Sequence, residues 1–272
     1  MVNKMTAINF CYEAAQLLPY IDWSYFYHAW GIKASDCGTK EAQQLKSDAI
    51  ALLNERSGEK VQALFRLCDA RSEGDNLLLD GERLPLLRQQ HTRPDDPCLC
   101  LSDFVSPTKD HVGIFATSMA DTFEGTDSND PYRHTLTQTL ADRLTEAAAS
   151  LLHSNVRTRK ELWGYSPNEH FTPQELNSEP FTGIRPAVGY PSLPDQSIIF
   201  IIDKLINLSQ IGITLTANGA MHPHSSVCGL MFAHPAARYF AVGKISDDQD
   251  RDYARRHGIA PEEIKKFLSK NI

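Results

Sequence analysis

The stretch Thr182-Gly-Ile-Arg-Pro-Ala-Val-Gly-Tyr-Pro-Ser-Leu-Pro-Asp195 decides how this chain is interpreted. Proline and glycine recur so closely along it that it can continue neither as a helix nor as a central strand. We therefore expect an ordered loop that holds one cation, Arg185, and carries Tyr190 at its tip. A guanidinium on a stiff backbone can donate two parallel hydrogen bonds to a carboxylate. The stretch thus predicts a receptor for a small ligand that carries a carboxylate.

Length and composition limit the other possibilities. The chain has 272 residues, of which 42% are hydrophobic, and this fits one large domain or two small ones with a real core. A formal net charge of −7 argues against nucleic acid as the main partner. We see neither an apolar run long enough for a membrane span nor a secretory signal. With six scattered cysteines and no signal, we expect free thiols in the cytoplasm.

Sequence periodicity predicts a mixture of helices and hairpin-like strands. Helices are expected at 7–19, 39–55, 132–156, 197–208, 247–257 and 261–270, a short one near 172, and a loop or short helix over 81–97. Strands are expected at 61–69, 76–79, 98–105, 111–118, 213–217, 227–233 and 239–245. Because the strands come in neighbouring groups and do not alternate singly with helices, the pattern favours an α+β fold with an antiparallel sheet. Glycine-rich phosphate loops are absent from the sequence.

The longest predicted helix, 132–156, carries two acids on one face. Asp142 and Glu146 lie four residues apart, so their side chains stand one above the other. One interpretation is an ordinary solvated face. The other is a carboxylate pair that attracts a cation, such as an ammonium or a sulfonium, because two neighbouring carboxylates repel unless a positive charge lies between them.

Two further groups leave alternatives open. Asp22 stands at the edge of the aromatic run 23–30, where it either caps the following segment or belongs to a binding site. His222 and His224 allow a metal site or a hydrolase, but no partner motif accompanies them, so a polar loop is the favoured interpretation. Together, Arg185, the acids and the aromatic residues suit a zwitterionic cation with a flat base. S-adenosylmethionine has these parts, although many other ligands share them.

Several segments resemble, in the same order along the chain, the activation domain of cobalamin-dependent methionine synthase. They are Ile21-Asp-Trp23, Leu101-Ser-Asp-Phe-Val105 with Pro107, Leu140-Ala-Asp-Arg-Leu-x-Glu-Ala147, Trp163-Gly-Tyr-x-Pro-Asn-Glu169, Gly183-Ile-Arg-Pro-Ala-x-Gly-Tyr-Pro191, Ser226-Val-x-Gly229 with His234-Pro235 and Tyr239, and Asp252-Tyr-Ala-Arg-Arg-x-Gly258. The resemblance covers nearly the whole chain from about Asp22.

The resemblance implies a fold and a set of ligand contacts. It implies one C-shaped α+β domain over residues 21–272, with a twisted antiparallel sheet, flanking helices and a lead-in helix over 1–20. S-adenosylmethionine would bind on the concave side, and no metal site is implied. The implied contacts are Asp22, Glu146, Arg185, Ala187, Gly189, Tyr190 and Tyr239, with Asp142 as a supporting acid.

The resemblance also implies an activity that needs other proteins. In the family, this domain supports reductive methylation of cob(II)alamin, in which a reductant such as flavodoxin supplies an electron and S-adenosylmethionine supplies the methyl group. Catalysis here is positioning, with Tyr190 placed to meet the corrin. The sequence contains neither the cobalamin-binding histidine loop nor the zinc-thiolate site. We therefore expect part of a methyltransferase system of methionine biosynthesis, with the cobalamin on a partner protein, and Met1 favours a separate subunit over a C-terminal fragment.

Two departures from the family pattern support an alternative. Residues 192–196 and 222–226 differ from the usual motifs. They leave the implied ligand contacts in place but alter the surface beside them. The alternative is an S-adenosylmethionine sensor or scaffold without catalytic participation, and a third hypothesis, from the histidines, is a metalloenzyme.

Overall fold

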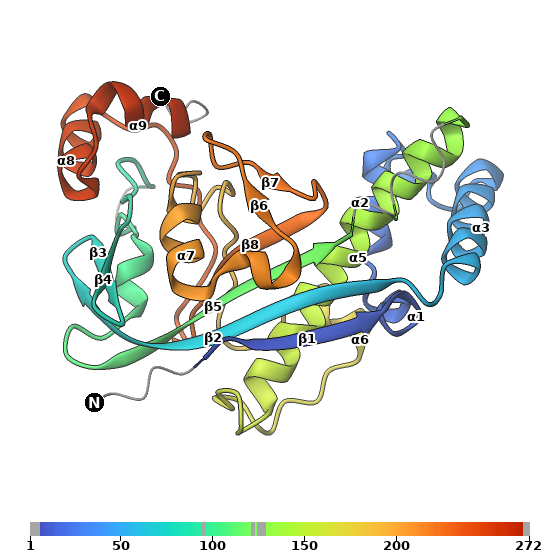
Figure 1. Cartoon of the computed structure of the whole chain (residues 1–272), viewed down its shortest axis with the longest axis horizontal. Coiled ribbons are helices and arrows are strands. Elements are labelled where there is room, and N and C mark those ends of the chain that lie inside the picture. The colour runs from blue at the N-terminus through green and yellow to red at the C-terminus, as the bar shows by residue number, and fades with distance from the viewer. Residues whose placement is uncertain (1–5, 94–95, 121–122, 124–128, 269–272) are drawn as a thin grey trace.

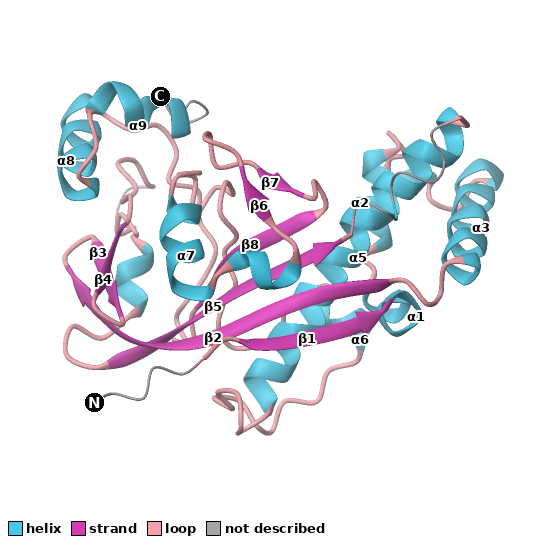
Figure 2. Ribbon diagram, in the orientation of Figure 1, coloured by secondary structure: helices cyan, strands magenta, loops and turns pink. Residues whose placement is uncertain are grey.

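The computed structural model describes residues 6–93, 96–120, 123 and 129–268. Long strands run across the molecule, and helices gather at both of their ends and rise on the same side, which gives the C-shaped outline (Figures 1 and 2). The strands are β1 (Ile8–Glu13), β2 (Lys60–Glu73), β3 (Asn76–Leu79), β4 (Glu82–Pro85), β5 (Asp110–Met119), β6 (Thr214–Leu215), β7 (Met221–His222) and β8 (Ser226–Met231). The α-helices are α1 (Ala14–Leu17), α2 (Trp23–Ala29), α3 (Lys40–Glu55), α5 (Pro131–Thr158), α6 (Pro173–Leu176), α7 (Ile198–Ile206), α8 (Asp247–His257) and α9 (Pro261–Phe267). Short 3-10 turns are η1 (Leu18–Tyr20), η2 (Ala34–Asp36), η3 (Leu101–Phe104) and η4 (Leu208–Ile211).

The main sheet is built around β2. Its strand order is β4-β3-β2-β5-β8, and β1 pairs with the first half of β2 on the edge that β3 uses farther along. The pairs of this sheet are antiparallel, as the sequence predicts, and β2 and β5 run side by side with Phe65 opposite Phe115. Strands β6 and β7 form a separate small hairpin.

Alternating side chains bury both faces of the central strands, because successive residues of a strand point to opposite faces. Phe65 and Phe115 face a core that is shared with α1, α2, α3 and α5. Leu64 and Ile114 face a second core that includes α7. A third, smaller cluster holds α8 and α9 and includes Tyr253.

Helix α5 covers the first of these faces and is the longest helix of the described chain, as predicted. Pro131 opens it and the side chain of Asp130 accepts hydrogen bonds from the amides of Tyr132 and Arg133. Leu140 and Leu144 on its inner face are fully buried. The helix has 28 residues, and part of its polar face contributes to the site described below.

The N-terminal segment corrects one prediction. Residues 7–19 were predicted as a helix, but Ile8 to Glu13 form an edge strand, and helix α1 has only four residues. The reason is a period of two: Ile8, Phe10 and Tyr12 pack on the core, while the residues between them face outward. The lead-in is therefore part of the main sheet. Residues 1–5 lie outside the described residues.

Three other segments also differ from the sequence prediction. Residues 81–97 begin with β4, because Asp80-Gly81 has positive φ angles of 49° and 90° and makes the two-residue hairpin turn that this dipeptide favours. Residues 98–105 contain the turn η3 and no strand, because the Asp103 carboxylate accepts a hydrogen bond from the Cys100 amide. Residues 239–245 join no sheet and bond instead to the loop at Pro191 and Ser192.

Helix α2 and strand β7 were not predicted, and the strand predicted at 213–217 is reduced to the two residues of β6, whereas most other elements agree with the prediction. The hairpin of β2 and β3 turns at Gly74, and Thr39 caps α3 through the amide of Ala42. Helices α6, α7, α8 and α9 form where they were expected. No helix among the described residues combines the length and the apolar character needed to cross a bilayer.

The proline-rich loop docks on the free edge of β8. Ile184 and Ala187 form antiparallel bridges with Phe232 and Gly229, and the Val188 amide donates to the Cys228 carbonyl at 2.9 Å. The loop can lie this close because Gly229 has no side chain. A Cβ at Gly229 would stand 2.2 Å from the Pro186 carbonyl oxygen. Gly229 is thus a point of close backbone approach, a common role of glycine within a strand.

Replacing Gly229 with alanine should therefore destabilise the protein. The added Cβ must displace the loop backbone, and overpacking of this kind costs about 1–3 kcal/mol in free energy of unfolding. Urea denaturation measures the difference. Gly38→Ala is the matched control, because nothing lies within 4 Å of a Cβ there. Equal unfolding midpoints for the two variants would contradict the tight docking.

Candidate ligand-binding site

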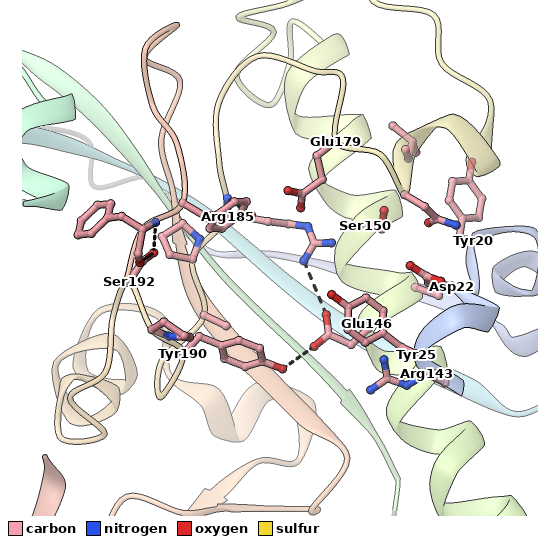
Figure 3. A pocket seen from close by; sticks show the side chains of 18 residues that line it. Tyr20, Asp22, Tyr25, Arg143, Glu146, Ser150, Glu179, Arg185, Tyr190 and Ser192 are labelled. Carbon is pink, nitrogen blue, oxygen red and sulfur yellow. Dashed lines mark hydrogen bonds and ion pairs between the residues drawn. The ribbon is translucent and has the colours of Figure 1, made fainter. Parts of the chain in front are cut away.

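A cavity of about 610 Å³ opens beside the docked loop. Its walls come from the polar face of α5, the loop around residues 185–192, residues 239–240, the chain at 20–25 and the segment 176–179. Figure 3 shows Arg185 reaching across the middle of this space toward α5. The volume falls within the range of sites for small organic ligands.

The backbone of Arg185 is fixed by a hydrogen bond, whereas its guanidinium has hydrogen-bonding capacity left for a ligand. Its amide donates to the Tyr239 hydroxyl at 3.0 Å. Its side chain is 19% exposed, and Nη1 lies 3.7 Å from Glu146 Oε2. Its Nε is buried without a hydrogen-bond partner among the described residues. Because a buried donor without a partner is costly, this guanidinium is suited to a carboxylate entering the cavity.

Glu146 connects the two functional residues of the loop. Its other carboxylate oxygen, Oε1, accepts a hydrogen bond from the Tyr190 hydroxyl at 3.1 Å (Figure 3). The negative charge of Glu146 and partial burial raise the pKa of Tyr190 to about 12. Tyr190 is therefore a neutral donor at physiological pH, and its ring remains 52% exposed at the rim of the cavity.

Asp22 lies on the opposite wall of the cavity, where it caps a helix; its role in ligand binding stays a prediction. Its carboxylate accepts from the Ser24 amide at 2.9 Å, so it caps α2, and it also lines the cavity. Beside it, the exposed ring of Tyr25 lies 5.8 Å from the Arg143 guanidinium. The aromatic run is thus divided, with Phe26 buried in the core and Tyr25 at the site.

Of the other predicted residues, two line the cavity and two lie outside its lining. Ala187 and Tyr239 line the cavity, and burial raises the pKa of Tyr239. Gly189 is outside the lining and has a φ of 84°, which turns the chain so that Tyr190 faces the site. Asp142 is outside it as well. Its carboxylate accepts from Ser225 Oγ at 2.8 Å and so ties α5 to the loop before β8.

Among the lining residues that sequence analysis missed are Tyr20, Ser150 and Glu179. Ser150 could have been found, because it follows Glu146 by four residues on the same helical face. Glu179 had no local signal in the sequence. Burial raises the pKa of its carboxyl group and the positive charge of Arg185 opposes that rise.

The histidine segment forms the strand β7 and the loop after it. The Ser226 amide donates to the carbonyl of His224 at 2.8 Å, and both histidine side chains are exposed. In the part of the chain that the structure describes, no three His, Cys, Asp or Glu side chains are grouped to hold a metal ion.

Comparisons with known proteins match almost the whole chain. The family described as "Vitamin B12 dependent methionine synthase, activation domain" matches residues 13–258. The chain belongs to this family. The solved structure of a MetH reactivation domain bound to AdoHcy superposes with a TM-score of 0.90 at 33% sequence identity, over 99% of this chain and 91% of the other.

Membership agrees with what the structure of this activation domain shows. The α+β fold with its curled antiparallel sheet, expected from the resemblance, is confirmed. The residues that the resemblance implied as ligand contacts remain predictions. Asp22, Glu146, Arg185, Ala187, Tyr190 and Tyr239 line one cavity of the activation domain, and Gly189 and Asp142 support it from outside.

The link between Glu146 and Tyr190 can be tested by titration. Glu146→Gln removes the main cause of the raised pKa, so the Tyr190 phenol should ionise closer to its usual pKa of about 10. The neutral phenol donates to Glu146 below its pKa, so in the parent protein this contact persists until the pH rises through about 12. Ultraviolet absorbance of tyrosinate, taken as the difference from Tyr190→Phe variants, measures both values. Equal pKa values would refute the link.

Proposed function

We propose that this activation domain binds S-adenosylmethionine in the cavity beside Arg185 and takes part in reductive methylation of a cobalamin that a partner protein carries. The observation that carries the proposal is the buried Nε of Arg185, which lacks a partner within the described chain although it lies among acids and aromatic rings. The relative bound to AdoHcy supports the same ligand class.

The lining offers a group for each part of the ligand. Arg185 would donate to the ligand's carboxylate. Glu146 and Glu179, on either side of that guanidinium, would attract the ammonium and sulfonium charges, because opposite charges within a partly dry cavity attract strongly (Figure 3). Tyr20 and Tyr25 would flank the adenine ring, whose flat face suits aromatic contact. Asp22 would accept from a hydroxyl or amino group on that side.

When bound, S-adenosylmethionine would supply a methyl cation which, with one electron from a flavodoxin-type reductant, converts cob(II)alamin to methylcobalamin and leaves neutral AdoHcy. The chain's own residues provide positioning, since the step needs no general base. Tyr190, half exposed at the rim, would contact the incoming corrin while its hydroxyl stays bonded to Glu146. The partner would therefore be the cobalamin-binding module of a methionine synthase.

Removing the guanidinium should weaken ligand binding. We expect Arg185→Ala to lower the affinity for S-adenosylmethionine by about 2–4 kcal/mol, the usual effect of truncating one partner of a desolvated charged pair. Isothermal titration calorimetry measures the dissociation constant. Arg255→Ala is the matched control, because Arg255 is a surface residue of α8 that pairs with Asp252. An unchanged constant in Arg185→Ala would reject the carboxylate site.

Removing the rim phenol should harm methylation more than binding. With Tyr190→Ala, we expect the fold and the ligand affinity to be largely kept and the rate of methylcobalamin formation to fall, because the corrin loses its contact surface. The assay combines this domain with a cobalamin module, a reductant and S-adenosylmethionine, and follows the corrin spectrum. Tyr132→Ala is the control, because Tyr132 is an exposed tyrosine outside the cavity.

The same assay separates the proposal from its alternative. Equal rates for Tyr190→Ala and the parent would refute the role of Tyr190. Tight ligand binding by the parent without any methylcobalamin would instead favour the sensor or scaffold.

A further inference from the structure

A buried ion pair lies behind the loop that carries Arg185, outside the cavity. Arg157, near the end of α5, is 1% exposed, and its Nε donates to Glu169 Oε2 at 2.7 Å. Glu169 is 14% exposed. Neither residue lines the cavity. Buried ion pairs add little net stability compared with apolar residues of the same size, so the value of this pair must be sought in the geometry that it imposes.

The pair holds the two residues that lead into the loop. The second carboxylate oxygen of Glu169 accepts a hydrogen bond from the Thr182 amide at 2.9 Å. The Arg157 guanidinium stacks over the ring of Phe181 at 3.9 Å from its centre. A planar guanidinium is suited to both contacts at once, which a lysine ammonium could not reproduce. The pair therefore fixes the backbone directly before Gly183.

The two residues between Thr182 and Arg185, Gly183 and Ile184, are also held by close contacts. Gly183 has a φ of 88°, and a Cβ there would stand 2.3 Å from the Phe232 carbonyl oxygen and 2.7 Å from the Tyr165 hydroxyl. Ile184 then pairs with Phe232 through hydrogen bonds of 3.0 and 2.9 Å. Because Gly183 and Ile184 cannot move freely, the position of the Thr182 backbone determines the position of the Arg185 backbone.

Charge gives the pair a second role. His153, which is near enough to both arginines to feel their charge, is fully buried and bonds through Nε2 with the Tyr165 hydroxyl at 3.0 Å. Burial and the positive charges of Arg157 and Arg185 hold the pKa of His153 well below its usual value. Glu169 neutralises Arg157 at close range, so the positive charge of Arg185 is left to act on the cavity.

We propose that Arg157 and Glu169 are positioning residues for carboxylate recognition: they set the backbone at Thr182 and thereby aim the Arg185 guanidinium into the cavity. This inference rests on the proposed function. It predicts that the pair controls affinity only for ligands that carry the carboxylate.

Two ligands distinguish positioning from general stability. S-adenosylmethionine carries the carboxylate, and methylthioadenosine has the same nucleoside without the amino acid part. We expect Glu169→Gln to weaken S-adenosylmethionine binding by about tenfold to a hundredfold, the scale on which small misplacement acts. Methylthioadenosine binding should change by less than about twofold, because it does not use Arg185. Calorimetric titration of the full chain measures both dissociation constants.

A double-mutant cycle tests whether the effect passes through Arg185. In the Arg185→Ala background, Glu169→Gln should cause no further loss of S-adenosylmethionine affinity, because the group that it positions is gone. The matched control is Asp80→Asn, which removes the charge from another ion pair of the sheet, Arg66 with Asp80, where both side chains are about one tenth exposed. It should lower the thermal midpoint and leave both dissociation constants unchanged.

A fallback variant avoids an uncompensated buried charge. Arg157→Met with Glu169→Leu removes both charges together, so the protein should fold, yet the Thr182 amide loses its acceptor and S-adenosylmethionine binding should still weaken selectively. Equal weakening of both ligands, or a full additional loss in the Arg185→Ala background, would overturn the positioning role. Failure of the parent protein to bind S-adenosylmethionine would instead reject the proposed function itself, and this inference with it.

Discussion

The structure around the cavity depends on the close contact between the proline-rich loop and strand β8. The loop lies along the free edge of β8, with Ala187 paired to Gly229, and the missing side chain at Gly229 is what allows this approach. This contact positions the residues that the loop contributes to the site. Arg185 and Tyr190 belong to the docked segment, and α5, which packs on the sheet through its apolar face, contributes Glu146 and Ser150 to the same cavity.

The charged groups in the cavity are only partly paired with one another. Arg185 and Glu146 face each other at 3.7 Å, a longer separation than a direct hydrogen bond, while Glu146 is engaged by Tyr190. A group of partly buried charges such as this gains when a ligand supplies the remaining contacts. The buried pair of Arg157 and Glu169 behind the loop is satisfied in itself, and it suits a fixed support.

Much of the fold could be predicted from local patterns. The helix from Pro131, the cap at Thr39 and the hairpin into β3 follow from periodicity and turn chemistry, which act over a few residues. The errors arose where a nearby signal was overlooked or outweighed. The Asp80-Gly81 turn was a readable signal, whereas Asp103 bends an apolar segment through a single side-chain hydrogen bond.

By itself, the sequence determined that Arg185 sits on a loop rich in proline and glycine and that Glu146 lies on a long helix, because proline, glycine and helical spacing act locally. Only the tertiary structure decided which acids share its space. Glu146 and Glu179 meet Arg185 across the cavity, while Asp142, although it lies one turn from Glu146, turns to Ser225. The reason is physical: distances between elements far apart in the chain depend on how the sheet curls and how α5 packs across it, and no local pattern encodes them.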